Sequence, residues 1–318
     1  MAISEFSLIE RYFRRPQKGN GATRVGIGDD GAILAVGSQS ELVVSTDTLV
    51  EGVHFLPDTA PETLGHKVLA VNLSDLAAMG AKPKWVFLSL TLPQTDENWL
   101  AAFSSSFLSL AEQYSVELAG GDTTRGPLSL SVTIMGEVAS GKGLLRSGAN
   151  VGDKIFVTGT LGDAGLGLWQ AKAQNVAHSG AIERYLKPIP RVQVGCSLEG
   201  IASACIDISD GLAADLSHIL QKSGVAADLQ WDKLPFSVSV KEYIDQSGDW
   251  AFPITAGDDY ELCFTVPQAH LHELEKVQFD SACSISEIGE IRQGQGLRIY
   301  RNSELLKLGR LGYQHFNE

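Results

Sequence analysis

The spacing of hydrophobic and polar positions predicts alternating helices and strands along the first half of the chain. Apolar residues alternate or run together where strands are expected, and they recur every three to four residues where helices are expected. In chain order the predicted elements are a helix at 5–13, a strand at 42–50, a helix at 60–80, a strand at 84–93, a helix at 97–114, and strands at 116–126 and 128–138. This order is typical of an α+β mixture rather than of a strict doubly wound repeat.

The second half of the chain begins after a cluster of turn residues. Gly148, Asn150 and Gly152 stand close together before a new strand. The elements predicted beyond them are a strand at 154–159, helices at 164–174 and near 190–202, a strand, acidic turn and helix within 204–224, a strand at 260–267 and a C-terminal hairpin. Because 318 residues are too many for one small core, we expect two domains, residues 1–147 and 148–318.

Composition and charge narrow the classes of function. Hydrophobic residues make up 44% of the chain and charged residues 20%, as in an ordinary globular protein. The formal net charge of −13 argues against binding to nucleic acid or to an anionic membrane, because both need surfaces rich in Lys and Arg. The negative charge does not exclude anionic small molecules as ligands, provided that metal ions mediate the contact.

Targeting and membrane signals are missing from the sequence. The start of the chain lacks a basic stretch followed by an apolar run, and Phe6, Ile9, Tyr12 and Phe13 share one helical face instead. No apolar stretch reaches the roughly 18 residues that span a membrane. The four cysteines form no C-x-x-C pair, which favours scattered buried thiols in a reducing compartment. We therefore expect a cytoplasmic protein.

Aspartates stand where predicted strands end or helices begin, each flanked by Gly, Ser or Thr. They are Asp29, Asp30, Asp47, Asp75, Asp122, Asp207 and Asp210. Singly, each is also explained as a helix cap or a turn residue. Gathered in one cleft, they would repel one another unless cations neutralised them. Hard oxygen donors without His or Cys favour Mg²⁺ or Mn²⁺, and magnesium often shares carboxylates with a nucleoside triphosphate.

Common nucleotide motifs do not fit. The stretch GIGDDG matches G-x-G-x-x-G, but Asp29 and Asp30 would repel a pyrophosphate, and two strands rather than a helix are predicted after it. No G-x-x-x-x-G-K-[ST] loop, H-R-D or D-F-G sequence occurs. The glycine-rich turn at 157–165 either covers phosphates or simply joins a strand to a helix.

Seven motifs in this order resemble the thiamine-monophosphate kinase family, within the aminoimidazole-ribonucleotide synthetase-like superfamily. They are GIGDD, STDTLVEGVHF, AVNLSDLAAMGAKP, GGDTTRG, RSGA, DISDGL and GDDYELCF. The resemblance covers nearly the whole chain. It implies phosphorylation of thiamine monophosphate by ATP with several Mg²⁺ ions, the final step in making thiamine diphosphate. It also implies a two-domain α/β fold whose N-terminal sheet pairs into a barrel across a homodimer, with a C-terminal α/β domain completing the site.

The resemblance also implies roles for individual residues. Metal ligands would be Asp30, Ser45, Thr46, Asp47, Asp75, Asp122, Asp207 and Asp210; ATP would contact Gly121, Asp122, Arg146 and Ser209; the substrate would contact His54, Asp258 and Tyr313. Asp258 stands where the family commonly has Glu. No general base is expected, because the acceptor phosphate is already ionised near pH 7.

Three other functions compete with this interpretation. Selenophosphate synthetase would carry a reactive Cys in an N-terminal loop, whereas the first cysteine here is Cys196. Aminoimidazole-ribonucleotide synthetase would show a different N-terminal signature from STDTLVEGVHF. A non-catalytic nucleotide- or metal-binding regulator differs from an enzyme by its lack of turnover.

Overall fold

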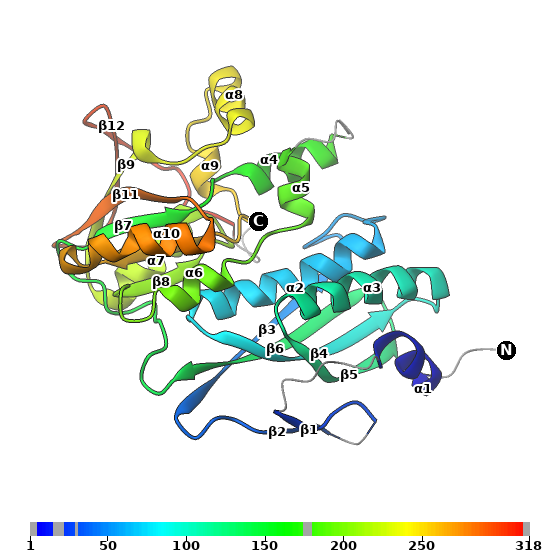
Figure 1. Ribbon diagram of the computed structural model, residues 1–318. Coiled ribbons are helices and arrows are strands. Elements are labelled where there is room, and N and C mark those ends of the chain that lie inside the picture. The colour runs from blue at the N-terminus through cyan, green and yellow to red at the C-terminus, as the bar shows by residue number, and fades with distance from the viewer. Residues whose placement is uncertain (1–4, 15–21, 29–30, 174–179, 314–318) are drawn as a thin grey trace. The chain divides into compact units, whose positions relative to one another are not determined.

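The computed structural model describes residues 5–14, 22–28, 31–173 and 180–313. Its contacts divide the chain into two compact units (Figure 1). The first unit comprises Met1–Leu76 and Ala81–Gly141, and the second comprises Ala77–Gly80 and Lys142–Glu318. The division after Gly141 lies a few residues before the domain boundary expected from the turn residues.

The first unit is built on a four-stranded mixed sheet covered on one face by two helices (Figure 1). The strand order is β3 (Ser40–Val50), β6 (Ser129–Ala139), β4 (Lys82–Leu92) and β5 (Glu117–Arg125), and the helices are α2 (Pro61–Ala78) and α3 (Glu97–Gln113). β6 is antiparallel to β3 and β4, whereas β4 and β5 run parallel and are joined through α3. β3 and β5 are therefore the outer strands.

Strict alternation of side chains decides which face of this sheet is covered. On β6, Val132 and Ile134 are fully buried, whereas Thr133 between them is half-buried on the open face. Phe103 and Phe107 of α3 are fully buried and stack on each other. Burial of this helix-facing layer is the main hydrophobic stabilisation of the first unit.

A shorter N-terminal part accompanies the sheet of the first unit. It consists of α1 (Glu5–Leu8), a π-helical turn η1 (Ile9–Phe13), and the paired short strands β1 (Thr23–Val25) and β2 (Ile33–Leu34). Trp85 of β4 donates its indole N–H to the Thr23 hydroxyl at 3.0 Å. This bond ties β1 to the sheet.

The second unit contains a seven-stranded mixed sheet. Its order is β13 (Glu304–Leu306), β12 (Gly296–Arg301), β9 (Ala226–Gln230), β11 (Ile285–Arg292), β7 (Lys154–Thr158), β10 (Leu262–Val266) and β8 (Ala204–Asp207). Only the pair β9 and β12 is parallel among the pairings of this sheet in the described residues.

Helices of the second unit surround this sheet, and α7 fills the centre of its core. They are α4 (Asp163–Lys172), α5 (Gly180–Leu186), α6 (Val192–Ser197), α7 (Leu212–Ser223), α8 (Val238–Ser247), α9 (Phe252–Thr255) and α10 (Leu274–Ser281), with 3-10 turns η2 (Trp231–Lys233) and η3 (Gln268–Glu273). Leu212, Leu216 and Ile219 form the apolar stripe of α7 and are fully buried in the core cluster of the unit.

The sequence prediction of alternating elements is confirmed for the first unit and for much of the second. Both sheets mix parallel and antiparallel strands, which excludes a strict doubly wound repeat. The sequence prediction missed α5, α8, α9, α10, β9 and β11. None of the described helices combines the length and apolarity needed to cross a bilayer.

Candidate functional site

In the first unit, strand β3 and helix α2 bring three predicted metal ligands together. Ser45 and Asp47 are two residues apart on β3, so their side chains share the helix-facing side. The Ser45 hydroxyl donates to Asp75 Oδ2 of α2 at 2.5 Å. Asn72 accepts the backbone N–H of Asp47 at 3.2 Å and lies on the same face of α2 as Asp75, three residues on. The first and last residues of the N-L-S-D motif, Asn72 and Asp75, therefore both bond to strand β3.

The two carboxylates of this cluster are close enough to affect each other's ionisation. Burial first, then the negative charge of Asp75 and a hydrogen bond with it, raise the pKa of Asp47 from its ordinary 3.8 to about 6. The cluster thus concentrates negative charge near neutral pH. Thr46 is exposed on the other side of β3, where its hydroxyl pairs with that of Thr133 at 2.8 Å.

His54 follows β3 in a tight turn that fixes its ring. The backbone N–H of Val50 donates to His54 Nδ1 at 3.0 Å, and the backbone N–H of His54 donates to the Val50 carbonyl. Because Nδ1 accepts, the proton of the neutral ring is assigned to Nε2. In this tautomer, Nε2 of His54 is a hydrogen-bond donor.

A cavity of about 880 Å³ in the first unit lies against the middle of β4 and β5. Its walls come from residues 9–14, 26–32, 87–89 and 118–123, apart from Asp29 and Asp30, which lie outside the described residues. Gly121 and Asp122 border it. A side chain at Gly121 would place a Cβ 1.9 Å from the Leu88 carbonyl oxygen, so glycine alone fits there.

In the second unit, two distant chain segments converge on an acidic turn at 207–210. Asp207 ends β8 and is buried, and Ser209 and Asp210 follow it half-buried. The Asp258 N–H donates to the Ser209 carbonyl at 2.8 Å, and the Tyr313 N–H donates to the Asp210 carbonyl at 3.0 Å. The predicted residues of three separate motifs are thus held together by backbone hydrogen bonds.

The C-terminal segment approaches this turn very closely. A Cβ on Gly312 would lie 2.4 Å from the Asp210 carbonyl oxygen, so a larger residue would push the segment away. Next in the chain, Tyr313 has a side chain that is 49% exposed. The glycine lets an exposed aromatic residue lie beside an acidic turn.

Asp215, a residue that the motif analysis did not single out, lies beneath this turn. Its Oδ2 accepts the backbone N–H groups of Ser209 and Asp210, each at 3.0 Å. Burial raises the pKa of Asp215 to about 7, while those two hydrogen bonds and the charge of Arg146 oppose the shift. The sequence signal was an acidic residue on the apolar stripe of a predicted helix.

The 257–261 segment, which contains the GDDYE stretch, holds its first acidic side chain beside aromatic rings. Asp258 and Tyr260 adopt left-handed backbone conformations, with φ of 69° and 49°, which is uncommon for such residues. The Tyr260 hydroxyl donates to Asp258 Oδ1 at 3.3 Å. Burial, and then the charge of Asp258, raise the pKa of Tyr185, which places that ring near the same carboxylate.

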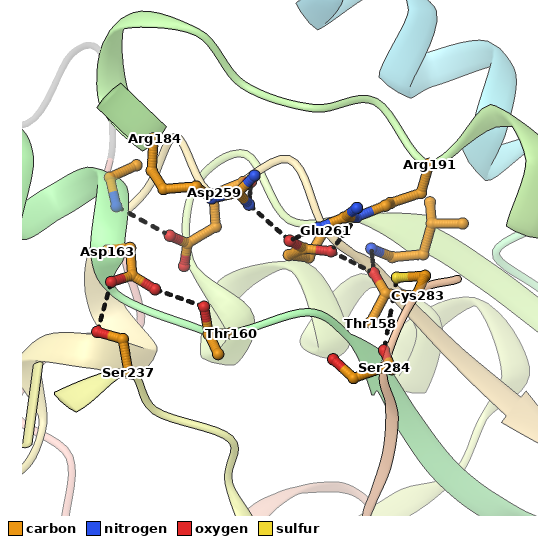
Figure 2. Close-up of polar contacts among 12 residues, drawn as sticks. Thr158, Thr160, Asp163, Arg184, Arg191, Ser237, Asp259, Glu261, Cys283 and Ser284 are labelled. Atoms are coloured by element: carbon orange, nitrogen blue, oxygen red, sulfur yellow. Dashed lines mark hydrogen bonds and ion pairs between the residues drawn. The ribbon is translucent and has the colours of Figure 1, made fainter. Parts of the chain in front are cut away.

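Asp259, the next residue, decides what the glycine-rich turn at 157–165 does. Its buried carboxylate accepts the N–H of Gly162 at 2.7 Å and of Ala164 at 3.3 Å, at the start of α4. Figure 2 shows the position of Asp259 beside Asp163 and Glu261. Burial raises the pKa of Asp259 despite these bonds. Amides that a phosphate would need are occupied by a protein carboxylate, so the turn joins strand to helix.

Glu261 closes the segment with a buried ion-pair network. Arg191 binds its carboxylate with two N–H groups, both at 2.6 Å, and Arg184 donates at 2.5 Å (Figure 2). The Thr158 hydroxyl donates to the same carboxylate at 2.6 Å. Glu261 has no exposed side-chain surface, so removal of either arginine would leave buried charge poorly compensated.

The structure thus gathers the predicted residues into separate sets. Ser45, Asp47 and Asp75 form one, Gly121 and Asp122 border the cavity, and the acidic turn joins Asp258 and Tyr313. Asp30 lies outside the described residues. Within the described part of the chain, no group of three or more His, Cys, Asp or Glu side chains has metal-binding geometry.

The chain matches two protein-family models over most of its length. "AIR synthase related protein, N-terminal domain" matches residues 28–138, and "AIR synthase related protein, C-terminal domain" matches residues 150–302. The thiamine-monophosphate kinase of Salmonella typhimurium is 46% identical over 322 residues, which cover 99% of each chain.

Two solved structures resemble this one. The crystal structure of thiamine-monophosphate kinase from Stenotrophomonas maltophilia K279a has a TM-score of 0.84 at 42% identity, and the match covers 90% of this chain and 93% of that one. AaThiL, solved in complex with AMPPCP and TMP, has a TM-score of 0.78 at 33% identity, with coverage of 91% and 92%.

The charge on the Asp47–Asp75 pair predicts a pH-dependent stability in metal-free protein. A carboxyl whose folded pKa is raised binds its proton more tightly when folded, so stability falls as pH rises from about 4 to about 6. Asp47→Asn removes the repulsion. It should raise the melting temperature at pH 8 by roughly 2–4 °C and leave it nearly unchanged at pH 4.

Thermal melts in EDTA measure this difference. Asp245→Asn, the same change at an exposed position of α8, is the control and should have no effect at either pH. A lower melting temperature for Asp47→Asn at pH 8 would contradict repulsion between the two carboxylates.

Proposed function

The chain belongs to the thiamine-monophosphate kinase family of AIR synthase related proteins, and we propose that it transfers a phosphoryl group from ATP to thiamine monophosphate. The products are thiamine diphosphate and ADP. One observation carries the proposal: 46% identity to a thiamine-monophosphate kinase along 99% of both chains. The AaThiL complex with AMPPCP and TMP supports the choice of both ligands.

The reaction needs two anions brought into line, and no general base is required. The acceptor phosphate is already ionised near pH 7, so the work is positioning and charge neutralisation. No side chain is therefore assigned as a proton acceptor. The residues of this chain act by holding the two phosphate-bearing molecules and the cations between them.

Magnesium fits the donor set of the chain. Asp47 and Asp75 lie against each other, and their mutual repulsion is the kind that a hard divalent cation relieves. The residues that would hold the ions are Asp30, Ser45, Thr46, Asp47, Asp75, Asp122, Asp207 and Asp210. When bound, Mg²⁺ neutralises phosphate charge and orients the transferring group.

The nucleotide is assigned to Gly121, Asp122, Arg146 and Ser209. Support comes from the cavity of about 880 Å³ that Gly121 and Asp122 border, which is large enough for a nucleotide. Arg146 is exposed, and its positive charge lowers the pKa of Asp215, which lies beneath the acidic turn. This position supports a role for Arg146 in binding phosphate near Ser209.

Thiamine monophosphate is assigned to His54, Asp258 and Tyr313. The Nε2–H of His54 suits a phosphate oxygen as its acceptor. The cationic thiazolium ring suits a carboxylate among aromatic rings, and Asp258 lies close to Tyr260 and Tyr185. The exposed ring of Tyr313 adds a further stacking surface.

The active form is proposed to be a homodimer in which the sheets of two first units close a barrel. Leu42 and Val44 are 42% and 51% exposed on the open face of the sheet, which favours burial by a partner. Asp47 lies on β3 and Asp122 on β5, the two outer strands. Pairing of outer strands between two copies would bring Asp47 of one toward Asp122 of the other and leave no open edge.

Turnover tests the proposed function. Incubation with ATP, Mg²⁺ and thiamine monophosphate should yield thiamine diphosphate, EDTA should stop the reaction, and excess Mg²⁺ should restore it. Asp75→Asn should lower kcat/KM by about 100-fold or more, because a charged ligand oxygen is lost. Asp245→Asn is the matched control. Absence of product from folded wild-type protein would remove the enzyme hypothesis.

Asp258→Glu tests the substrate assignment. The longer side chain restores the residue common in the family, so the KM for thiamine monophosphate should stay unchanged or fall by about threefold while kcat changes little. The KM for ATP is the internal control and should not move. A large rise in KM for thiamine monophosphate would mean that the pocket has been rebuilt around Asp.

Light scattering tests the dimer. The wild-type chain should show twice the 34.1 kDa mass of one copy. Val44→Arg places a charge on the open face and should shift the population to monomer and lower turnover at least about tenfold. Leu305→Arg, at another exposed apolar position, is the control. A monomeric wild-type enzyme with full activity would contradict the barrel.

A further inference from the structure

We infer that Asp215 is a positioning residue whose carboxylate holds the backbone of the acidic turn, so that the side chains of Ser209 and Asp210 face the ligands. This role rests on the function proposed above, because it concerns how proposed nucleotide and metal residues are held. Asp215 itself is not placed in contact with a ligand. It acts through the two residues that it binds.

Asp215 is buried in α7, so its carboxylate needs hydrogen-bond partners inside the protein. It is the fourth residue of the helix and is only 3% exposed. Its neighbours on the apolar stripe, Leu212 and Leu216, are fully buried. An acidic side chain in such a place is costly unless it is hydrogen-bonded, and here one oxygen accepts two backbone N–H groups at 3.0 Å.

These two bonds complete the backbone bonding of the turn. The carbonyl groups of Ser209 and Asp210 accept from Asp258 and Tyr313, and their N–H groups donate to Asp215. All four backbone groups are therefore bonded within the protein, and ligand contact falls to the side chains. Because the apolar stripe of α7 is buried in the core cluster, Asp215 ties the geometry of the turn to the core of the unit.

Three variants separate positioning from ligation and from packing. Asp215→Asn keeps an oxygen that accepts both N–H groups, since both already bind the same atom. Asp215→Leu has a similar shape and extends the apolar stripe, but it accepts no hydrogen bond. Ser217→Ala is the control on the same helix, where the hydroxyl bonds the Ala213 carbonyl at 2.6 Å.

Hydrogen exchange of the full chain without ligands measures the anchor directly. The amides of Ser209 and Asp210 should exchange about tenfold faster or more in Asp215→Leu, and within about threefold of wild type in Asp215→Asn and Ser217→Ala. Unchanged protection in Asp215→Leu would overturn the inference. Should that variant fail to fold, loss of protection in Asp215→Asn would overturn it as well.

Kinetics then separate the three roles. Asp215→Leu should raise the KM for ATP about tenfold or more, and Asp215→Asn should recover most of that loss, because small misplacements of ligating groups are costly. If Asp215→Asn is as impaired as Asp215→Leu, Asp215 is itself a ligand, which overturns positioning. If Asp215→Leu has a lower melting temperature but wild-type kinetics, the role of Asp215 is packing, and the positioning inference is overturned. If wild-type protein makes no thiamine diphosphate, the proposed function fails while hydrogen exchange still decides the anchor.

Discussion

Buried carboxylates that bind the protein's own N–H groups hold the second unit's acidic segments in place. Asp215 accepts two backbone amides of the 207–210 turn, and Asp259 accepts two at the start of α4. Glu261 is compensated instead by two arginines and a threonine hydroxyl. A carboxylate removed from water is tolerated only with such partners, so each one fixes the segment around it. The left-handed conformations of Asp258 and Tyr260 persist because flanking contacts hold them.

In the first unit, by contrast, two carboxylates are close neighbours of each other. Asp47 and Asp75 lie against each other, and burial first, then the charge of Asp75, raises the pKa of Asp47 to about 6. The burial and repulsion of these charges cost stability, although the Ser45–Asp75 hydrogen bond joins β3 to α2. Local conflict of this kind is typical of functional sites, where a ligand completes the set of charges. The two groups of aspartates therefore differ: protein groups compensate those of the second unit, whereas under the proposed function a cation would compensate Asp47 and Asp75.

Sequence reasoning predicted the elements of the first unit because their apolar spacing is regular and their turns are marked by glycine and polar residues. It could predict that Ser45 and Asp47 share a face, since strand geometry decides that locally. It could not predict Asp215, Asp259 or Glu261 as structural anchors. Glu261 bonds to residues that lie 70 to 103 positions away in the sequence. An acidic residue in a motif does not by itself indicate whether its side chain contacts a ligand or an arginine. Strands β9 and β11 were missed for a related reason, because tertiary pairing rather than local pattern specifies them.

Helix N-termini are a common way to bind phosphate, yet the one that follows the glycine-rich turn is occupied. Gly162 and Ala164 direct their N–H groups at Asp259, so the α4 dipole serves the scaffold. The proposed function therefore assigns phosphate recognition to arginine and to cations held by aspartates. A chain with a net charge of −13 needs positive charge from outside to bind two phosphorylated molecules, and the aspartates that repel one another in its absence are the proposed place for it.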